Sequence, residues 1–282
     1  MMELGENRYG KARVRVMKVE RGAGRHRVDE WNVEVWLTGD FARCFLEGDN
    51  SVILPTDTMK NAVYSLARRS KEATIEGFAK ELVAHFLATQ AQIDGAGARV
   101  CSVGWAPIET QAGKHPVAFI QTGPEVAMAT VTQKRGEAAQ VAGGMEQVTI
   151  LKTDRSAFSG FKRDRLTTLK ETEDRLLGTA MTATWFYTKD AADFDAVRAR
   201  IREALLATFA EHASKSVQQT LYAMGQAALE TAAEVDRIFL SMPNKHCNLV
   251  DLSAFGQDNP NHIFVPIDEP HGAIEALVRR AK

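Results

Sequence analysis

The sequence predicts an α+β fold made of two similar halves, each an antiparallel sheet with two helices on one face. Apolar and polar residues alternate in several segments, as they do in half-buried strands. Two pairs of segments carry apolar residues at the spacing of an amphipathic helix. Because the order strand, strand, helix, helix, strand, strand occurs twice, we expect two structural repeats, over residues 1–137 and 138–282.

The first half is expected to hold two pairs of strands around one pair of helices. Its strands are placed at residues 11–20, 33–37, 99–109 and 116–134, the last two joined around residues 113–116. Its helices are placed at residues 56–69 and 74–90, with Thr56 or Asp57 and then Thr74 as N-cap. Residues 41–46 indicate loop with a little strand, residues 51–54 an extended segment, and Gly95-Ala96-Gly97 a turn.

The second half follows a connector rich in glycine and alanine, over residues 135–144. Its strands are placed near residues 148–150, and at 175–188, 237–242, 246–252 and 263–266. Its helices are placed at residues 193–212 and 216–231, with Ser216 as N-cap, and a short helix is expected after Gly272. The long insertion over residues 154–174 separates its first two strands.

Composition excludes several classes of protein. The chain has 282 residues, 45% of them hydrophobic and 25% charged, which is ordinary for a globular protein. A net charge of −1 provides no basic surface for nucleic acid, and no apolar run is long enough to cross a bilayer. The three cysteines form no Cys-x-x-Cys motif and fit a reducing cytoplasm.

Short motifs for known cofactors are missing from the sequence. It contains no glycine-rich nucleotide loop, nucleophile elbow or His-Glu-x-x-His motif. The seven histidines are scattered and show no spacing typical of metal ligands. We therefore expect neither a metal site nor a cofactor.

The stretch Leu54-Pro55-Thr56-Asp57 places a hydroxyl at the start of a predicted helix. Pro55 disfavours helix at the residue before it, so Thr56 lies beside free backbone N–H groups that suit a polar or anionic ligand. Taken alone, this stretch is better explained as an ordinary helix cap. Lys11 alone would likewise be a solvated strand lysine, and His246 part of a polar turn.

Four other stretches change this interpretation. They are Arg8-Tyr9-Gly10-Lys11, Phe158-Ser159-Gly160-Phe161 continuing through Thr167-Thr168-Leu169-Lys170-Glu171-Thr172 to Asp174-Arg175, Ser216-Val217-Gln218, and Leu240-Ser241-Met242-Pro243-Asn244-Lys245-His246. With the Thr56 stretch they make five motifs, in order, that resemble the urate oxidase family. Its members are cofactor-independent oxidoreductases that oxidise uric acid with dioxygen. The resemblance implies the tunnelling fold, or T-fold, in which tandem repeats assemble into a homotetramer around a barrel tunnel.

The resemblance also implies a set of site residues. Lys11 and Thr56 would form a proton-transferring dyad, with His246 as its titrating partner. A lysine partly withdrawn from water would accept a proton near neutral pH more readily than a solvated one. The residues implied in substrate binding are Thr56, Asp57, Phe158, Arg175, Val217, Gln218, Asn244 and Ile274.

The chemistry of these side chains fits a flat anion with oxygens and nitrogens on its edges. The Arg175 guanidinium would grip one edge bidentately, and the Gln218 amide would meet the donor–acceptor face opposite. Phe158 would stack on the ring. The resemblance further implies that Asn244 and Thr56 hold dioxygen, that Val217 and Ile274 close the pocket, and that the backbone N–H of Asp57 reaches the ligand.

The implied reaction converts urate, dioxygen and water into 5-hydroxyisourate and hydrogen peroxide, a step of purine degradation. Lys11 and Thr56 belong to the first half and the other residues to the second, so the site is expected at subunit interfaces. The last residues lack the Ser-Lys-Leu peroxisomal address of many eukaryotic members, so we expect a bacterial, cytoplasmic enzyme. The alternatives are another T-fold activity on a purine- or pterin-like ring, or a non-catalytic ligand-binding homologue.

Overall fold

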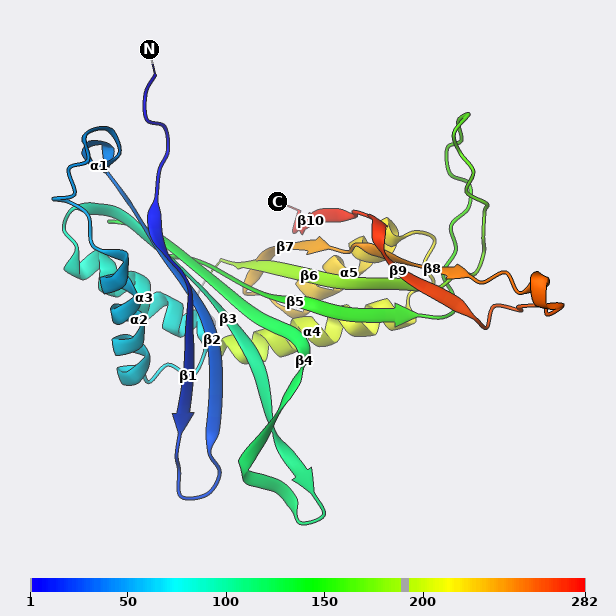
Figure 1. Cartoon of the computed structure of the whole chain (residues 1–282), viewed down its shortest axis with the longest axis horizontal. Helices are drawn as coiled ribbons and strands as arrows, with labels where there is room; N and C mark the ends of the chain where they lie inside the picture. The colour runs from blue at the N-terminus through cyan, green and yellow to red at the C-terminus, as the bar shows by residue number, and fades with distance from the viewer. Residues whose placement is uncertain (1, 189–192, 282) are drawn as a thin grey trace. The chain divides into compact units, whose positions relative to one another are not determined.

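The computed structural model describes residues 2–188 and 193–281, which divide into two compact units (Figure 1). The first unit comprises Met1–Met145 and Phe186–Asp195, and the second comprises Glu146–Trp185 and Ala196–Lys282. Both units combine antiparallel strands with a pair of long helices, so the predicted α+β class is confirmed.

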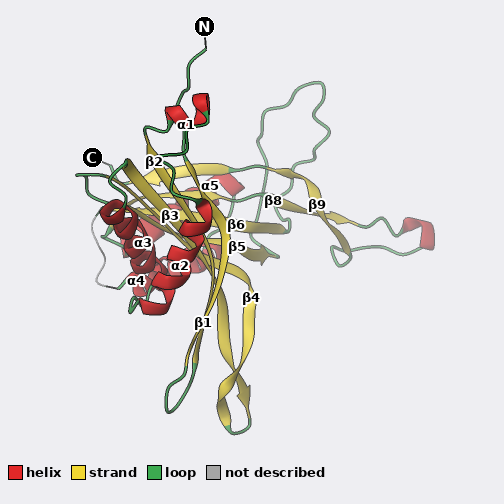
Figure 2. Ribbon diagram, turned by 60° about the vertical axis from the view of Figure 1, so that its left-hand side comes forward, coloured by secondary structure: helices red, strands yellow, loops and turns green. Residues whose placement is uncertain are grey.

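The first unit is a four-stranded antiparallel meander with helices on one face (Figure 2). Neighbouring strands follow chain order: β1 (Tyr9–Glu20), β2 (Arg27–Gly39), β3 (Ile93–Thr110) and β4 (Gly113–Lys134). Between β2 and β3 run α1 (Ala42–Glu47), α2 (Thr56–Arg69) and α3 (Ile75–Thr89). The predicted hairpin of residues 11–20 and 33–37 is therefore confirmed as β1 and β2, and both long helices are found.

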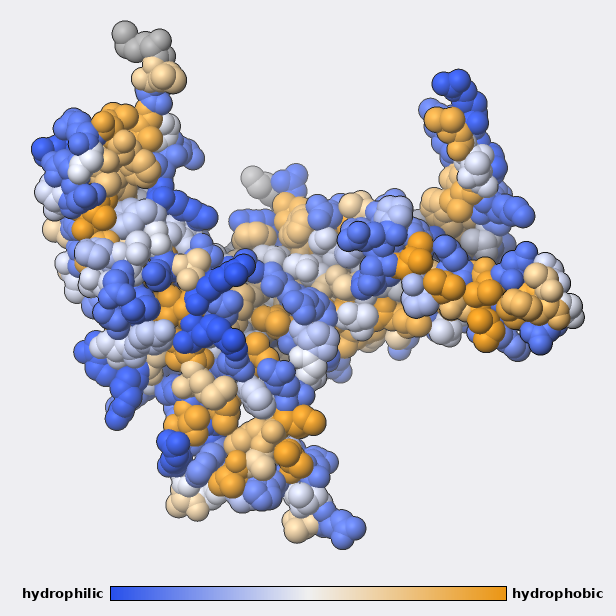
Figure 3. All heavy atoms as spheres, in the orientation of Figure 1, coloured by the Kyte–Doolittle hydropathy of each residue, from blue (hydrophilic) through white to orange (hydrophobic). Residues whose placement is uncertain are grey.

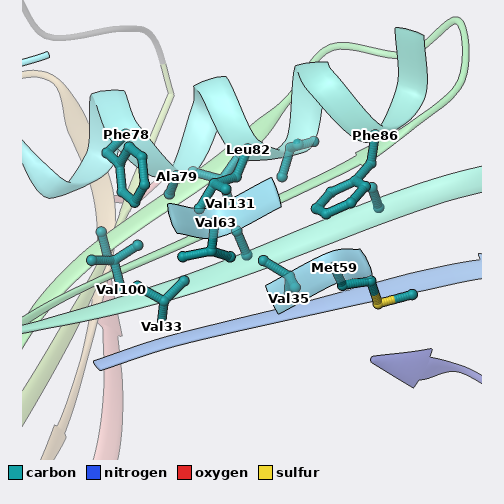
Figure 4. Packing of buried hydrophobic residues seen from close by; sticks show 14 of the residues in the cluster. Val33, Val35, Met59, Val63, Phe78, Ala79, Leu82, Phe86, Val100 and Val131 are labelled. Carbon is teal, nitrogen blue, oxygen red and sulfur yellow. The ribbon is translucent and has the colours of Figure 1, made fainter. Parts of the chain in front are cut away.

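The core of this unit lies between the sheet and the two long helices. Val33 and Val35 alternate along β2 with polar residues, and both are fully buried. Facing them, α2 contributes Met59 and Val63, and α3 contributes Phe78 among others (Figure 4). Truncating a buried aromatic side chain to alanine costs about 3–5 kcal/mol. The helices are thus held on the sheet by the apolar stripe that the sequence pattern predicts.

The second unit repeats the arrangement. The strands that lie wholly or mostly in it are, in sheet order, β5 (Gln140–Lys152), β6 (Leu177–Tyr187), β7 (Val235–Ser241) and β10 (Glu275–Arg279). Two more strands, β8 (Asn244–Leu249) and β9 (Phe264–Gly272), form a hairpin attached to β6, with the 3₁₀ turn η1 (Ser253–Phe255) between them. Its helices are α4 (Phe194–Glu211) and α5 (Val217–Thr231).

Cations from other elements satisfy the carbonyl ends of the four long helices. Lys18 donates to the carbonyl of Ser70 just after α2, and Arg135 donates to carbonyls at the end of α3. Arg155 does the same for α4, and Arg280 for α5. The last carbonyls of a helix lack intrahelical partners and carry partial negative charge, so these contacts stabilise each helix end.

The helix starts agree with prediction at two positions and differ at the third. Thr74 and Ser216 each accept a backbone N–H in the first turn of the helix that follows, as expected of N-caps. The expectation that Thr56 or Asp57 caps α2 is wrong, because Pro55 occupies the N-cap position without a side-chain bond. Thr56 is instead the first helical residue, and its hydroxyl is not used as a cap.

Three expected irregular segments turn out to be regular structure. Residues 41–46 belong largely to helix α1, which Gly48 ends in a left-handed conformation. The connector predicted over residues 135–144 is shorter than expected, because β5 begins at Gln140. Gly95-Ala96-Gly97 is strand rather than turn, because β3 begins at Ile93 and crosses the Trp36 ring. A Cβ at Gly97 would lie 2.1 Å from that ring, so glycine is required by the close approach.

The expectation of a terminal helix after Gly272 is also wrong. Residues Glu275–Arg279 form β10, which pairs with β7 in antiparallel register. Val278 of this strand packs directly on Gly225 of α5, where a Cβ would lie 2.6 Å from the valine side chain. This segment is a strand because it pairs with β7, and its own sequence carries no pattern that predicts the pairing. None of the helices in the described part of the chain has the length and apolar character needed to cross a membrane.

Candidate active site

The second unit contains a cavity of about 420 Å³, within the size range of small-molecule sites. Seven of the residues singled out from the sequence line it: Phe158, Arg175, Val217, Gln218, Asn244, His246 and Ile274. These residues come from segments far apart in the chain, and the fold brings them to one place.

Helix α5 supplies one wall of the cavity. Its first two residues are Val217, which is buried, and Gln218, which is exposed. The Ser216 hydroxyl accepts the backbone N–H of Gln219 at 3.1 Å and so fixes where the helix begins. Gln218 therefore presents a donor and an acceptor at the positive end of the helix.

Strand β8 supplies two further polar groups to the cavity. It carries Asn244, which is only 8% exposed, and the half-buried His246. Ile274 lies just before β10, where its carbonyl accepts the backbone N–H of Met242 at 2.8 Å. That bond ties the segment before β10 to the end of β7 and keeps Ile274 beside β8.

Arg175 contributes a positive charge to the lining of the cavity. Its side chain is half-buried, and its Nε atom is buried with no hydrogen-bond partner in the described chain. Burial lowers the pKa of Arg175 from its ordinary value, but a guanidinium remains charged throughout the physiological range. A buried cationic donor without a partner is costly, so this group is suited to a ligand with acceptor or anionic edges.

Phe158 provides an aromatic surface next to that cation. Its backbone N–H donates to the carbonyl of Thr172 at 2.7 Å and its carbonyl accepts the Thr172 N–H at 3.1 Å. Its ring stacks on Phe161, with centroids 5.0 Å apart and an interplanar angle of 15°. The long insertion thus presents a flat apolar face, which suits a planar ring.

The first unit holds the other predicted residues, Lys11, Thr56 and Asp57. Lys11 is half-buried on β1 and lies at a bulge, because the register with β2 shifts between Lys11 and Val14. Arg13 within this bulge adopts a left-handed φ of 58°. Bulges of this kind re-aim side chains and are common beside active sites.

Lys11 lies close to the start of α2. The pKa of the Asp57 carboxyl is lowered mainly by its hydrogen bond and ion pair with Lys60, and the charge of Lys11 lowers it further. Thr56, next to Asp57, is half-buried. The first unit therefore brings the two members of the predicted dyad into one neighbourhood.

Tyr9 joins these two segments, a role that sequence reasoning missed. Its hydroxyl oxygen accepts the backbone N–H of Leu54 at 2.8 Å, so β1 is tied to the loop before Thr56. Its ring lies edge-on to the buried Phe41, with centroids 4.8 Å apart. Burial raises the pKa of Tyr9, which keeps the hydroxyl neutral. A tyrosine hydroxyl that accepts a distant backbone N–H leaves no periodic signal in the sequence, so only the fold identifies its partner.

Other residues of the cavity were not predicted. They include Thr153, Leu169, Thr172, Asp174, Cys247, Asn248, Asn261 and Phe264. Among the described residues no group of three or more histidine, cysteine or acidic side chains could hold a metal ion. Cys44, Cys101 and Cys247, all in the described chain, form no disulfide.

Known proteins resemble the chain over nearly its whole length. The family model described as Uricase matches residues 7–132 and 141–275. Uricase from Arthrobacter globiformis is 45% identical over 277 residues, which cover 98% of this chain and 90% of the relative. Uricase from Dictyostelium discoideum is 37% identical over 283 residues, covering 100% and 99%.

Solved structures agree. The crystal structure of Arthrobacter globiformis uricase matches with a TM-score of 0.94 and 43% identity, covering 99% of this chain and 96% of that one. The tandem α+β units, together with these matches, place the chain among the oxidoreductases of the tunnelling fold. The chain belongs to the uricase family, whose members are urate oxidases.

Proposed function

We propose that this chain oxidises urate with dioxygen and water to 5-hydroxyisourate and hydrogen peroxide, in purine degradation. The observation that carries the proposal is the buried, unpaired Nε of Arg175 in a cavity that also holds Phe158 and Gln218. A guanidinium fork, an aromatic face and a primary amide together match the edges and the face of one planar anion.

Substrate binding would use contacts that are equal in ground and transition states. Arg175 would donate two parallel hydrogen bonds to one edge of urate, and Gln218 would exchange hydrogen bonds with the opposite edge. The Phe158 ring would stack under the purine. Val217 and Ile274 would close the sides of the cavity, and the backbone N–H of Asp57 would reach the remaining edge.

Proton transfer would depend on Lys11, Thr56 and His246. Urate must lose a proton before oxidation, and a threonine hydroxyl between ligand and amine would relay it by giving its own proton to Lys11. His246 would be the third member of this group, placed to exchange a proton with the pair. Asn244 would hold dioxygen over the ring together with Thr56.

The electrons would come from urate itself. Ground-state dioxygen is a triplet and does not attack a closed-shell molecule in one two-electron step, but deprotonated urate is electron-rich enough to give one electron first. The protein then has to remove a proton, hold the reactants face to face and exclude water. Addition of water completes the balance, with both atoms of dioxygen leaving as hydrogen peroxide.

We further propose that the active form is a homotetramer, in which the first unit of one chain completes the cavity in the second unit of another. Unpaired apolar surface supports assembly, since large exposed hydrophobic patches mark interaction sites (Figure 3). Exposed apolar residues lie on the β3–β4 hairpin, at Ile108, Val117 and Ile120, and on the β8–β9 hairpin, at Leu249, Phe255, Ile263 and Val265. We place the enzyme in a bacterial cytoplasm, which cysteines without disulfides support.

One assay tests the activity. Purified protein, treated exhaustively with EDTA, is given urate in air while urate absorbance and peroxide are followed together. We expect one peroxide per urate consumed, at a rate that added metals do not change. Consumption of urate without peroxide, activity that returns only with a metal, or preference for another purine or a pterin would contradict the proposal.

A further inference from the structure

Residues 154–158 form a segment that hydrogen bonds on one side to the loop before α5. The backbone N–H of Ser214 donates to the carbonyl of Arg155 at 2.9 Å, and the N–H of Ala157 donates to the carbonyl of Ser214 at 2.8 Å. This is a short parallel bridge centred on Ser156 and Ser214. Two residues further on, Ser216 caps α5, so the position of the segment sets the position of Gln218.

On its other side the same segment is bonded to the chain that enters β6. The backbone N–H of Arg175 donates to the carbonyl of Ser156 at 2.8 Å, and Phe158 pairs with Thr172. Ser156 is fully buried between the two sides. Segment 154–158 is therefore the common partner of the segment that carries Arg175 and of the loop that leads to Gln218.

A common partner has a mechanical consequence. Phe158 lies on the segment itself. Arg175 is hydrogen-bonded to one side of the segment, and the loop before α5 is hydrogen-bonded to the other. A shift of the segment would move the aromatic face, the guanidinium and the Gln218 amide relative to one another. Groups that must engage one rigid ring at the same time tolerate little relative displacement, and about 1 Å can cost on the order of a hundredfold in rate.

Arg155 fixes this segment to the rest of the unit. Its backbone adopts a left-handed φ of 55°, which an arginine rarely adopts without support. The support is its guanidinium, in which Nη2 donates to the carbonyl of Ala210 at 3.0 Å and Nη1 to that of Glu211 at 3.3 Å. These are the last carbonyls of α4, and Lys152 donates to the next one, that of His212.

We propose that Arg155 is a positioning residue for the substrate cavity. By holding the left-handed turn against the end of α4, it keeps Phe158, Arg175 and Gln218 in the relative positions that one planar ligand requires. Arg155 does not line the cavity, so it acts only through the residues that do. The assignment rests on the proposed binding roles of those three residues.

Arg155 is a better test of this idea than Lys152. The Lys152 side chain is buried against Phe209, with its Nζ atom 5.8 Å from the ring centre, so its loss would also remove core packing. Arg155 is exposed, so truncation removes hydrogen bonds and leaves the apolar core unchanged. Arg135 offers a matched control, because it makes the same kind of contact at the end of α3 in the first unit.

The experiment compares Arg155→Ala, Arg155→Lys and Arg135→Ala with the parent chain. The readouts are the dissociation constant of 8-azaxanthine, a flat unreactive urate analogue, and the kcat and KM for urate. We expect Arg155→Ala to weaken analogue binding about tenfold and raise KM in parallel, since it loosens the alignment of binding groups. Arg155→Lys, which keeps one cationic donor, should fall between. Arg135→Ala should lose thermal stability yet bind the analogue within about twofold of the parent.

Two results would overturn the assignment: parental affinity in Arg155→Ala, or an equal loss of affinity in Arg135→Ala. If Arg155→Ala does not fold, Arg155→Lys decides, and parental affinity in that variant would overturn it. Activity of the parent chain is measured first. A parent that does not oxidise urate contradicts the proposed function, whereas an active parent with an unaffected Arg155→Ala contradicts only the role of Arg155.

Discussion

The guanidinium carbon of Arg175 lies 5.1 Å from the centre of the Phe158 ring. At this distance a cation interacts favourably with the face of an aromatic ring. Backbone hydrogen bonds hold both residues, Arg175 through Ser156 and Phe158 through Thr172. The two groups are thus oriented before any ligand arrives, which reduces the ordering cost of binding.

Removing the guanidinium should abolish ligand capture. We expect Arg175→Ala to lose measurable affinity for 8-azaxanthine, because a desolvated ligand edge would lose its charged partner. Arg175→Lys should recover little, since an ammonium cannot form the bidentate contact. Arg163→Ala is the control: Arg163 lies over the neighbouring Phe161 ring at 5.4 Å but does not line the cavity. Titration of the analogue distinguishes the three, and retained affinity in Arg175→Ala would remove this residue from the site.

Removing the proposed proton acceptor, Lys11, should leave binding of the analogue intact. Lys11→Met is expected to bind the analogue normally and to lose turnover by on the order of a hundredfold or more, the usual size of an acid–base contribution. Lys114→Met, at an exposed lysine on β4, serves as control and should retain full turnover. Steady-state kinetics beside analogue titration separate binding from chemistry. Turnover near the parental value in Lys11→Met would mean that Lys11 is an ordinary strand lysine.

Sharing of the site between chains can be tested by mixing. Lys11 lies in the first unit and Arg175 in the second. Two inactive variants, Lys11→Ala and Arg175→Ala, should regain partial activity when their subunits exchange, because some sites then combine two intact halves. Size-exclusion chromatography of differently tagged chains verifies the mixed oligomers. Mixed oligomers without activity would show that each site is made by one chain.

Stability should depend on pH through His212. Its Nδ1 atom lies 3.2 Å from the hydroxyl of the buried Thr220. Burial, and then the charge of Lys152, lower the pKa of His212 below its ordinary value. The unfolded chain therefore binds the proton first, so stability falls as pH drops below about 6.5, the unperturbed histidine value, and continues to fall until the folded pKa is reached.

The measurement is the melting temperature between about pH 7.5 and pH 5.5, a window above the range where carboxylates titrate. The parent should lose stability toward the acid end, and His212→Gln should show a flatter profile. His26→Gln, at a half-buried histidine in the turn between β1 and β2, is the control and should keep the parental slope. An unchanged slope in His212→Gln would exclude His212 as its source.

Several features could be predicted from sequence because their signals are local. The bounds of α2, Thr56–Arg69, follow from Pro55 and an apolar stripe, and the caps at Thr74 and Ser216 follow from residue type. Strand alternation indicated the β1–β2 hairpin. The ordered motifs indicated the family and therefore which side chains to look for in the cavity. Each signal spans a few residues and needs no knowledge of distant partners.

Other features depend on contacts between residues distant in sequence, and only the tertiary structure decided them. The sequence around Gly97 predicts a turn, but the structure shows a strand in which glycine makes room for the Trp36 ring. Residues Glu275–Arg279 form a strand because they pair with the edge of β7. Tyr9 and Arg155 carry no motif that marks their roles, since each acts on a backbone group about 45 to 56 residues away. Local periodicity records which face of an element is buried, whereas the choice of partner is made by packing and hydrogen bonding across the whole unit.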